Sequence, residues 1–461
     1  MGFVERLTDF MWNPWLLGLF LATGLYYSIR TGFFQLFGVG RWLSATVGSL
    51  LRPGKRGSAG ITRFQALATA LASTIGTGSI AGVATAIFFG GPGAVFWMWV
   101  SALLGMMTGC AEKVLAVRYR RLKPDGTWEG GPMYYLSYGL HSTFLAGWFA
   151  LACVGGALVG GDLVQSNSIA QAMHALFGWD RLIVGLVTAG LAGIVLVGGI
   201  GRIARFSEFL VPVMGLLFLG SGAVVLWSRR AYLPGALQLI LTSALTPAAA
   251  AGGVGGYTIS AALRYGVARG VFTNEAGMGS SALVHAKAET KQPGEQGMWG
   301  ILEVFVATLV ICTMTALVIL VSGVYDPAQA LESIWSGDLT TVGVGVPLTA
   351  ASFSVVLGRG GEWVVSLCLL LFAFSSLLGW SYYGEVALGW LVRGRGWKTV
   401  WRTAFLVVAA VGSVGEVSLV WQLVDLFTAL MALPNLAALL VLSPQIMDSL
   451  NTYLKTQKAS R

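Results

Sequence analysis

Apolar residues in this chain form long runs instead of alternating with polar residues. A helix that crosses a membrane needs about 20 mainly apolar residues. Eleven runs meet or approach this length, near residues 11–29, 64–89, 94–118, 145–176, 182–200, 206–228, 235–262, 299–322, 363–392, 400–412 and 418–442. The strands of a transmembrane barrel would alternate apolar and polar residues instead. The pattern therefore predicts an all-α polytopic membrane protein with 11 transmembrane helices.

Glycine and hydroxyl residues interrupt the run at 64–89. Residues 73–82 contain Gly76, Gly78 and Gly82 beside several serines and threonines, and they carry no charge. Helix interiors disfavour glycine, and a bilayer offers no water to a broken backbone. A break persists where its freed groups face a cavity, a ligand or another helix, so it predicts a transport site. The alternative is a seam of small residues where helices pack closely.

Composition supports the membrane assignment and narrows the chemistry. The chain is 56% hydrophobic and 11% charged, whereas soluble domains have about 25% charged residues. The cysteines stand singly and the histidines lack a metal-ligand spacing, so we expect no cofactor. No H-E-x-x-H or similar grouping is present, and an enzyme is not expected.

Basic residues orient the predicted helices. Alternate loops hold 24 of the 29 lysines and arginines, counting Lys113, Arg264 and Arg269 among them. Because basic loops stay in the cytoplasm, we expect an outside N-terminus and a cytoplasmic C-terminus in a bacterial inner (plasma) membrane. The positive charge then faces anionic lipid, and no nucleic-acid partner is implied.

The runs divide into two equal sets after the first helix. This division predicts an extra N-terminal helix, a cytoplasmic linker, two five-helix repeats and a cytoplasmic tail, at residues 11–29, 30–63, 64–228, 235–442 and 443–461. The first helix of each repeat is interrupted, at 76–79 and at 246–256. Paired breaks in segments of opposite direction are typical of inverted-repeat transporters with a site at the bilayer midplane.

Three motifs resemble the alanine or glycine:cation symporter family. They lie at residues 76–84, 90–105 and 271–280, in the order found in that family. The resemblance implies the five-plus-five inverted-repeat fold of amino-acid, polyamine and organocation transporters, with two discontinuous helices and one additional N-terminal helix. The 272–280 motif is the alternative position for the second break. The chain departs from the family at Ser79, where asparagine is usual.

A broken helix offers donors and acceptors to a zwitterionic amino acid. The N–H groups of Thr77, Gly78 and Ser79 begin the second half-helix, where the helix dipole favours a carboxylate. The resemblance places Gln165 in the substrate pocket, and we add Phe272, Asn274 and Trp380 to the expected substrate-binding residues. Trp380 is the predicted wall that limits side-chain size, although tryptophans in membrane helices more often lie at the interface.

The resemblance to sodium-coupled relatives of this fold also implies a sodium site. Its oxygens would be the carbonyls of Ala72, Ile75 and Phe372 and the hydroxyls of Ser375 and Ser376. In the alternative, the two serines bond to carbonyls of their own helix, as serines in apolar helices often do.

Three acidic residues are candidates for coupling or gating. Asp162 lies three residues before Gln165, so both share one helix face. A carboxylate at that depth either contacts a cation, carries a proton, or pairs with a polar neighbour. Glu275, next to Phe272 and Asn274, is expected at an inner vestibule or gate. Asp425 is expected at an outer gate or as a helix-end carboxylate at headgroup level.

These observations together predict a secondary active transporter. It would import alanine or glycine with sodium by alternating access through the lipid bilayer. Proton coupling and a passive channel are the alternatives. The sequence leaves open the coupling ion, the choice between alanine and glycine, and the oligomeric state.

Overall fold

The computed structural model of the chain is mainly helical, and it describes residues 2–50, 60–124, 126–245, 259–336, 344–392, 394, 396–415 and 418–459. Among these residues, six helices are long and apolar enough to cross a membrane. The bent pair Arg63–Thr74 and Gly78–Gly90 makes a seventh if it is counted as one span. The predicted total of eleven is not reached by length and hydropathy alone, because helices such as α12 (Arg181–Leu196) are shorter.

The N-terminal part packs on the outside of the helical core. It consists of α1 (Gly2–Met11), α2 (Pro14–Arg30), α3 (Phe34–Phe37), α4 (Val39–Ala45) and α5 (Val47–Leu50). Helix α2 matches the predicted extra helix and starts with a proline, whose missing N–H has no partner at that position anyway. It packs against α8 (Gly93–Arg118) and α23 (Ser418–Val441).

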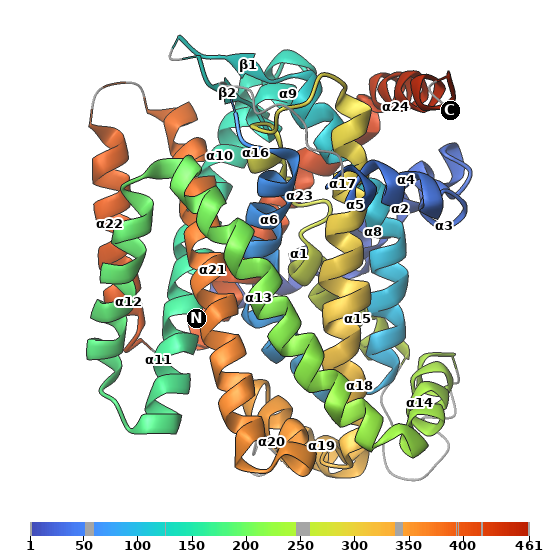
Figure 1. Cartoon of the computed structure of the whole chain (residues 1–461), viewed down its shortest axis with the longest axis vertical. Helices are drawn as coiled ribbons and strands as arrows, with labels where there is room; N and C mark the ends of the chain where they lie inside the picture. Colours follow the sequence, from blue (N-terminus) through green and yellow to red (C-terminus); the bar gives the residue numbers. More distant parts are fainter. Residues whose placement is uncertain are drawn as a thin grey trace.

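The first predicted repeat contains most of the blue-to-green ribbon in Figure 1. Its remaining elements are α6 (Arg63–Thr74), η1 (Gly78–Gly82), α7 (Val83–Gly90), β1 (Arg121–Leu122), β2 (Trp128–Glu129), α9 (Pro132–Tyr138), α10 (Thr143–Leu158), η2 (Val159–Leu163), α11 (Val164–Phe177) and α13 (Gly199–Ser228). A capping box starts α6, in which the Thr62 hydroxyl and the Gln65 side chain each bond the other residue's N–H at 3.1 Å.

The second predicted repeat completes the core. Its elements are η3 (Arg230–Tyr232), α14 (Leu233–Leu245), α15 (Ile259–Asn274), α16 (Ala282–His285), α17 (Pro293–Val304), η5 (Phe305–Cys312), α18 (Thr313–Ser322), α19 (Pro327–Ser336), α20 (Val346–Leu357), α21 (Arg359–Leu391), α22 (Trp397–Gly412), α23 and α24 (Ser443–Ala459). Wide π turns at η2 and η5 join helices that are otherwise continuous, and the π turn η1 begins the half-helix that continues as α7.

Two interrupted helices run in opposite directions beside each other. Helix α15 begins where α7 ends, since a Cβ on Gly90 would lie 3.2 Å from the Ala261 carbonyl. At the other side of the molecule, the N–H of Ile61, before α6, bonds the Lys287 carbonyl, after α16, at 3.2 Å. Figure 1 shows that second side at the top, near α24, and α14, α19 and α20 at the bottom.

A break is present at the alternative predicted position, within the 272–280 motif, while the first predicted position at 246–256 falls outside the described residues. Helix α14 ends at Leu245, residues 246–258 lie outside the described part, and α15 continues without interruption from Ile259 to Asn274. The backbone unwinds after Asn274, within the 272–280 motif. The glycines Gly277 and Gly279 have φ of 94° and 79°, a conformation that glycine adopts without steric cost.

Three basic residues were misplaced by the count of basic loops. Lys113 is fully buried inside α8, and is therefore not part of a loop. Arg264 and Arg269 lie in α15, ahead of the break, on the half of the molecule opposite the Arg63–Glu295 ion pair. A count of charges cannot distinguish an exposed basic residue from one that is paired within a helix.

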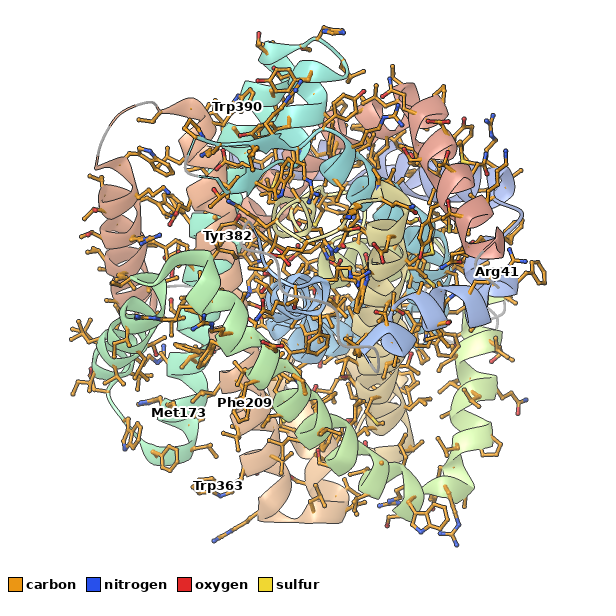
Figure 2. The ribbon with its side chains drawn as sticks, turned by 45° about the horizontal axis from the view of Figure 1, so that its top comes forward. Arg41, Met173, Phe209, Trp363, Tyr382 and Trp390 are labelled. Atoms are coloured by element: carbon orange, nitrogen blue, oxygen red, sulfur yellow. The ribbon has the colours of Figure 1, made fainter. Side chains whose placement is uncertain are left out.

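Large apolar side chains cover the periphery of the bundle. Phe209 and Trp363 are 72% and 50% exposed, and Figure 2 shows Trp363 at the lower edge of the molecule, whereas Tyr382 is only 5% exposed. Exposed apolar area on this scale is typical of a surface that contacts lipid. The buried core lies between α8, α10, α15, α17 and α21, where the interrupted helices meet their neighbours.

Candidate functional site

The first break separates α6 from η1 by three residues, and the two half-helices meet at 55°. The Ile75 N–H still bonds the Leu71 carbonyl, at 2.8 Å, but the next N–H groups turn elsewhere. The Gly76 N–H bonds the Thr74 carbonyl at 3.0 Å, and the Thr77 N–H reaches Gln165 Oε1 at 3.4 Å. The predicted interruption of residues 73–82 is therefore present.

The glycines of this break allow close approach by other helices. A Cβ on Gly76 would lie 2.5 Å from Ser376 Oγ, and one on Gly78 would lie 3.0 Å from the Phe272 ring. A Cβ on Gly82 would have no heavy atom within 4 Å. Gly76 and Gly78 are therefore required for close packing with other helices, whereas Gly82 is not.

Four of the five predicted sodium-site residues meet at the end of α6. The Ser375 hydroxyl donates to the carbonyls of Ala72 at 3.0 Å and Phe372 at 2.9 Å. The Ser376 hydroxyl donates to Ala72 at 3.1 Å and to Ser73 at 2.9 Å. The serines thus reach across to α6, and Ser375 also bonds a carbonyl of its own helix, as the alternative interpretation expected for that residue. No described hydrogen bond joins the Ile75 carbonyl to this group.

A small cavity of about 20 Å³ lies beside the break. A volume of this kind holds roughly one water molecule, so the site is closed in this conformation. The lining residues come from α6, η1, both sides of η2, α15, α21 and α23: Ser73, Thr74, Gly76, Gly78, Gly156, Gly160, Gln165, Phe272, Glu275, Trp380, Val424 and Thr428.

Five predicted site residues line this cavity and three predicted substrate contacts do not. Gly78, Gln165, Phe272, Glu275 and Trp380 are in its wall. Those outside the wall are Thr77, Ser79 and Asn274. Sequence reasoning missed the small residues Gly156 and Gly160, although glycines spaced through an apolar helix were a usable signal.

Gln165 and Asp162 lie on the third core helix and differ in their environment. Gln165 Nε2 donates to the Gly160 carbonyl at 3.1 Å, and its Oε1 faces the first break. Asp162 is fully buried, and neither carboxylate oxygen has a hydrogen-bond partner among the described residues. A buried acid in this state is costly if it is charged without a cation.

Trp380 forms one wall through contact with glycines of the third core helix. A Cβ on Gly161 would overlap the Trp380 Cβ, and one on Gly156 would lie 3.6 Å from its ring. Trp380 is 7% exposed and packs its ring against Tyr383, with centroids 5.4 Å apart. It is therefore an interior residue, and the interface-anchor alternative is wrong for it.

The second break brings Glu275 to the cavity. Glu275 has φ of 55°, in the left-handed region that non-glycine residues rarely adopt, and its Oε2 accepts a short hydrogen bond from Ser280. Asn274 turns the other way, and its Oδ1 accepts from the Ala276 N–H at 3.0 Å.

Arg269 and Asp425 close the cavity on the side of α14. Their side chains approach to 3.5 Å and are 15% and 25% exposed. The Arg269 guanidinium lies over the rings of Phe272 and Trp421, which themselves pack 5.8 Å apart. Asp425 is thus paired with a cation directly after the wall residue Val424, and is not itself in the cavity wall.

A group of buried charged residues lies on the other side of the second break. It comprises Glu112 and Lys113 of α8, His285 of α16 and Glu303 of α17, all with side chains that are fully buried. Sequence reasoning did not include these residues. The adjacent charges at 112–113 and the single acid in the run at 299–322 were the available signals.

Two antiparallel interrupted helices around a small closed cavity are the arrangement of secondary transporters. The chain matches the sodium:alanine symporter family over residues 1–461. It is 39% identical over 462 residues to the sodium/alanine symporter AgcS of Methanococcus maripaludis, covering 99% of this chain and 98% of that one. The chain belongs to the sodium:alanine symporter family, whose members are transporters and not enzymes.

Other relatives extend the comparison. The probable sodium/glutamine symporter GlnT of Bacillus subtilis is 37% identical over 456 residues, covering 98% of this chain and 90% of that one. The solved structure of MhsT in complex with L-phenylalanine has a TM-score of 0.55 at 13% identity, covering 84% of this chain and 90% of that chain. An Eremococcus coleocola manganese transporter has a TM-score of 0.51 at 16% identity, covering 84% and 78%. These likenesses show the fold.

Proposed function

We propose that this protein imports a small neutral amino acid, alanine or glycine, together with sodium by alternating access. The proposal is supported by the family, by its sodium/alanine relative, and by the closed cavity between two broken helices. We further propose that it lies in a bacterial plasma membrane with the side that carries α24 in the cytoplasm. Arg63, which pairs with Glu295 of α17, and Arg118, which pairs with Asp448 of α24, lie on that side, as basic residues in the cytoplasm would.

The cavity supports one orientation of the substrate. Glu275 is the only charged residue among the described residues that line it. A substrate ammonium group pairs best with this carboxylate, and the substrate carboxylate with the N–H groups that begin η1 near Gly78. Gln165 lies between the two ends and bonds the Thr77 N–H.

The same wall supports a preference for a small side chain. Trp380 and Phe272 bound a cavity that now holds about one water. Alanine already requires this wall to open, and a larger side chain would push Trp380 and Phe272 further apart, where overpacking costs about 1–3 kcal/mol. Separation of glycine from alanine would be weaker, because one methylene is worth about 1–3 kcal/mol at most.

Uptake into proteoliposomes tests the coupling. Purified protein is expected to accumulate labelled alanine or glycine under an inward sodium gradient and to stop when the gradient is collapsed. A proton gradient alone should not support accumulation. Equal uptake with and without both gradients would reject coupled transport and leave a passive channel.

Asp162 supports proton coupling as the second candidate function. Its carboxylate is buried without a described partner, which favours a protonated acid or a cation contact. If a proton is carried, the Asp162→Asn variant should lose accumulation driven by a proton gradient and keep alanine exchange. Sodium-driven accumulation that survives in this variant assigns coupling to the serine site instead.

A further inference from the structure

Glu112 occupies the place where the second break would otherwise need water or a ligand. Its Oε1 accepts hydrogen bonds from the N–H groups of Gly277 and Gly279, both at 2.9 Å. The same oxygen accepts a third bond from Asn435 Nδ2 at 2.7 Å. Glu112 is completely buried. The Glu112 carboxylate therefore accepts hydrogen bonds from backbone N–H groups that lost their helical partners when the chain unwound.

Lys113 links this carboxylate to the helices that follow the break. Its ammonium group lies 2.7 Å from Ser281 Oγ, 3.2 Å from Glu303 Oε2 and 3.4 Å from Glu112 Oε2. Glu303 Oε2 also lies 3.0 Å from His285 Nε2. Buried charges are tolerated when they are paired and hydrogen-bonded. Here one ammonium group serves two carboxylates, and the backbone N–H groups stabilise the remaining negative charge.

Asn435 carries the connection to α23. Its Nδ2 donates both to Glu112 and, at 2.8 Å, to the Gly277 carbonyl, while its Oδ1 accepts from Tyr135 OH. Helix α23 also supplies Val424 and Thr428 to the cavity wall. The break, α8 and α23 are thus joined at one point between the cavity and the side that carries α24.

We propose that Glu112 is a positioning residue that holds the second break against α23 and keeps the cavity closed toward α24. This inference rests on the proposed alternating-access function. Opening toward that side requires the segment after Asn274 to separate from α23, and the bonds of Glu112 and Asn435 oppose that separation. Glu112 acts through the Gly277 and Gly279 backbone and does not touch the substrate cavity.

Accessibility of a buried cysteine tests the proposal without a substrate. Val284 of α16 is fully buried, and Val284→Cys adds no volume. Protein carrying Val284→Cys is treated with a polar maleimide in substrate-free proteoliposomes, with the protein that keeps its four native cysteines as background. Adding Glu112→Gln should raise the labelling rate at least about tenfold, because the charge-assisted hydrogen bonds from Gly277 and Gly279 become weaker, neutral ones. Asn435→Ala should raise it by about threefold, through loss of neutral bonds.

Glu385→Gln is the matched control. Glu385 pairs with Arg402, 2.7 Å away, on α21 and α22, far from the break. With Glu385→Gln added to Val284→Cys, the labelling rate should stay within about twofold of that of Val284→Cys alone. External alanine should show a raised KM in Glu112→Gln with a smaller change in maximal rate, whereas general misfolding would lower the maximal rate alone.

The remaining outcomes also decide the matter. Labelling rates that match the parent in both Glu112→Gln and Asn435→Ala overturn the positioning role. If Glu112→Gln does not reach the membrane, Asn435→Ala decides, since it removes no charge. Raised labelling in protein that fails to transport alanine or glycine would reject the proposed substrate and support the role of Glu112.

Discussion

The two interrupted helices satisfy their unwound backbone in different ways. At the first break, the surrounding groups are neutral: the hydroxyls of Ser375 and Ser376, the amide of Gln165 and the backbone of η1. At the second, the carboxylate of Glu112 takes two backbone N–H groups and is itself paired with Lys113. The backbone of the first break is bonded by neutral dipoles, and the backbone of the second is held by a buried charge.

This difference separates binding from positioning. Neutral dipoles are not committed to a partner of opposite charge, so they can exchange an internal hydrogen bond for a cation or a substrate carboxylate at low cost. Buried carboxylates and ammonium groups lose several kcal/mol when a partner is removed. The first break therefore suits a ligand that enters and leaves, and the second suits a hinge that is kept in shape by the protein.

Removal of the lysine gives the largest expected effect. Lys113→Met leaves Glu112 and Glu303 buried without their cation, and should destabilise the protein by about 3–5 kcal/mol. Thermal unfolding of the purified protein in detergent measures the loss. The control Arg402→Met, at the partly exposed pair with Glu385, should cost at most about 1 kcal/mol. Equal losses in the two variants would contradict a special role for the buried charges.

A single methyl group at the first break should be the next largest effect. Gly76→Ala places a Cβ 2.5 Å from Ser376 Oγ and forces the hydroxyl from its position. Overpacking of about 1–3 kcal/mol corresponds to a loss of transport of about 5- to 150-fold. Gly82→Ala has no heavy atom within 4 Å of the new Cβ and should transport normally. Comparable loss in both variants would mean that any added bulk, and not crowding at Ser376, is responsible.

The smallest effect is expected from the hydroxyls. Ser375→Ala with Ser376→Ala should raise the sodium concentration for half-maximal uptake by about three- to tenfold, because two oxygens near Ala72 are lost. Alanine affinity at saturating sodium should change less. Ser354→Ala is the control, since that hydroxyl bonds its own helix at Ala350, 2.9 Å away. An unchanged sodium response in the double variant would exclude these hydroxyls from the cation site.

Local composition was enough to predict the first break and much of its surroundings. Glycines and hydroxyls inside an apolar run have a local meaning, because a missing Cβ and a missing water shell act within a few residues. The same reasoning reached Gln165 and the Ser375–Ser376 pair with help from family resemblance. The position of the second break was harder to predict, because two glycine-rich stretches were candidates for it. In addition, Glu275 has a positive φ, which a residue other than glycine rarely adopts and the sequence therefore does not indicate.

The sequence alone therefore determines the apolar runs, the interrupted first helix and the family motifs, because each depends on residues that are close together in the chain. The buried charges depend on contacts across the fold: Glu112 and Gly277 are 165 residues apart. From the sequence, Lys113 is expected in a loop, but in the structure residues of α17 and of the segment before α16 surround its ammonium group. Its burial is tolerated only because those helices bring it partners, and pairing between distant residues is set by packing, which no local pattern encodes.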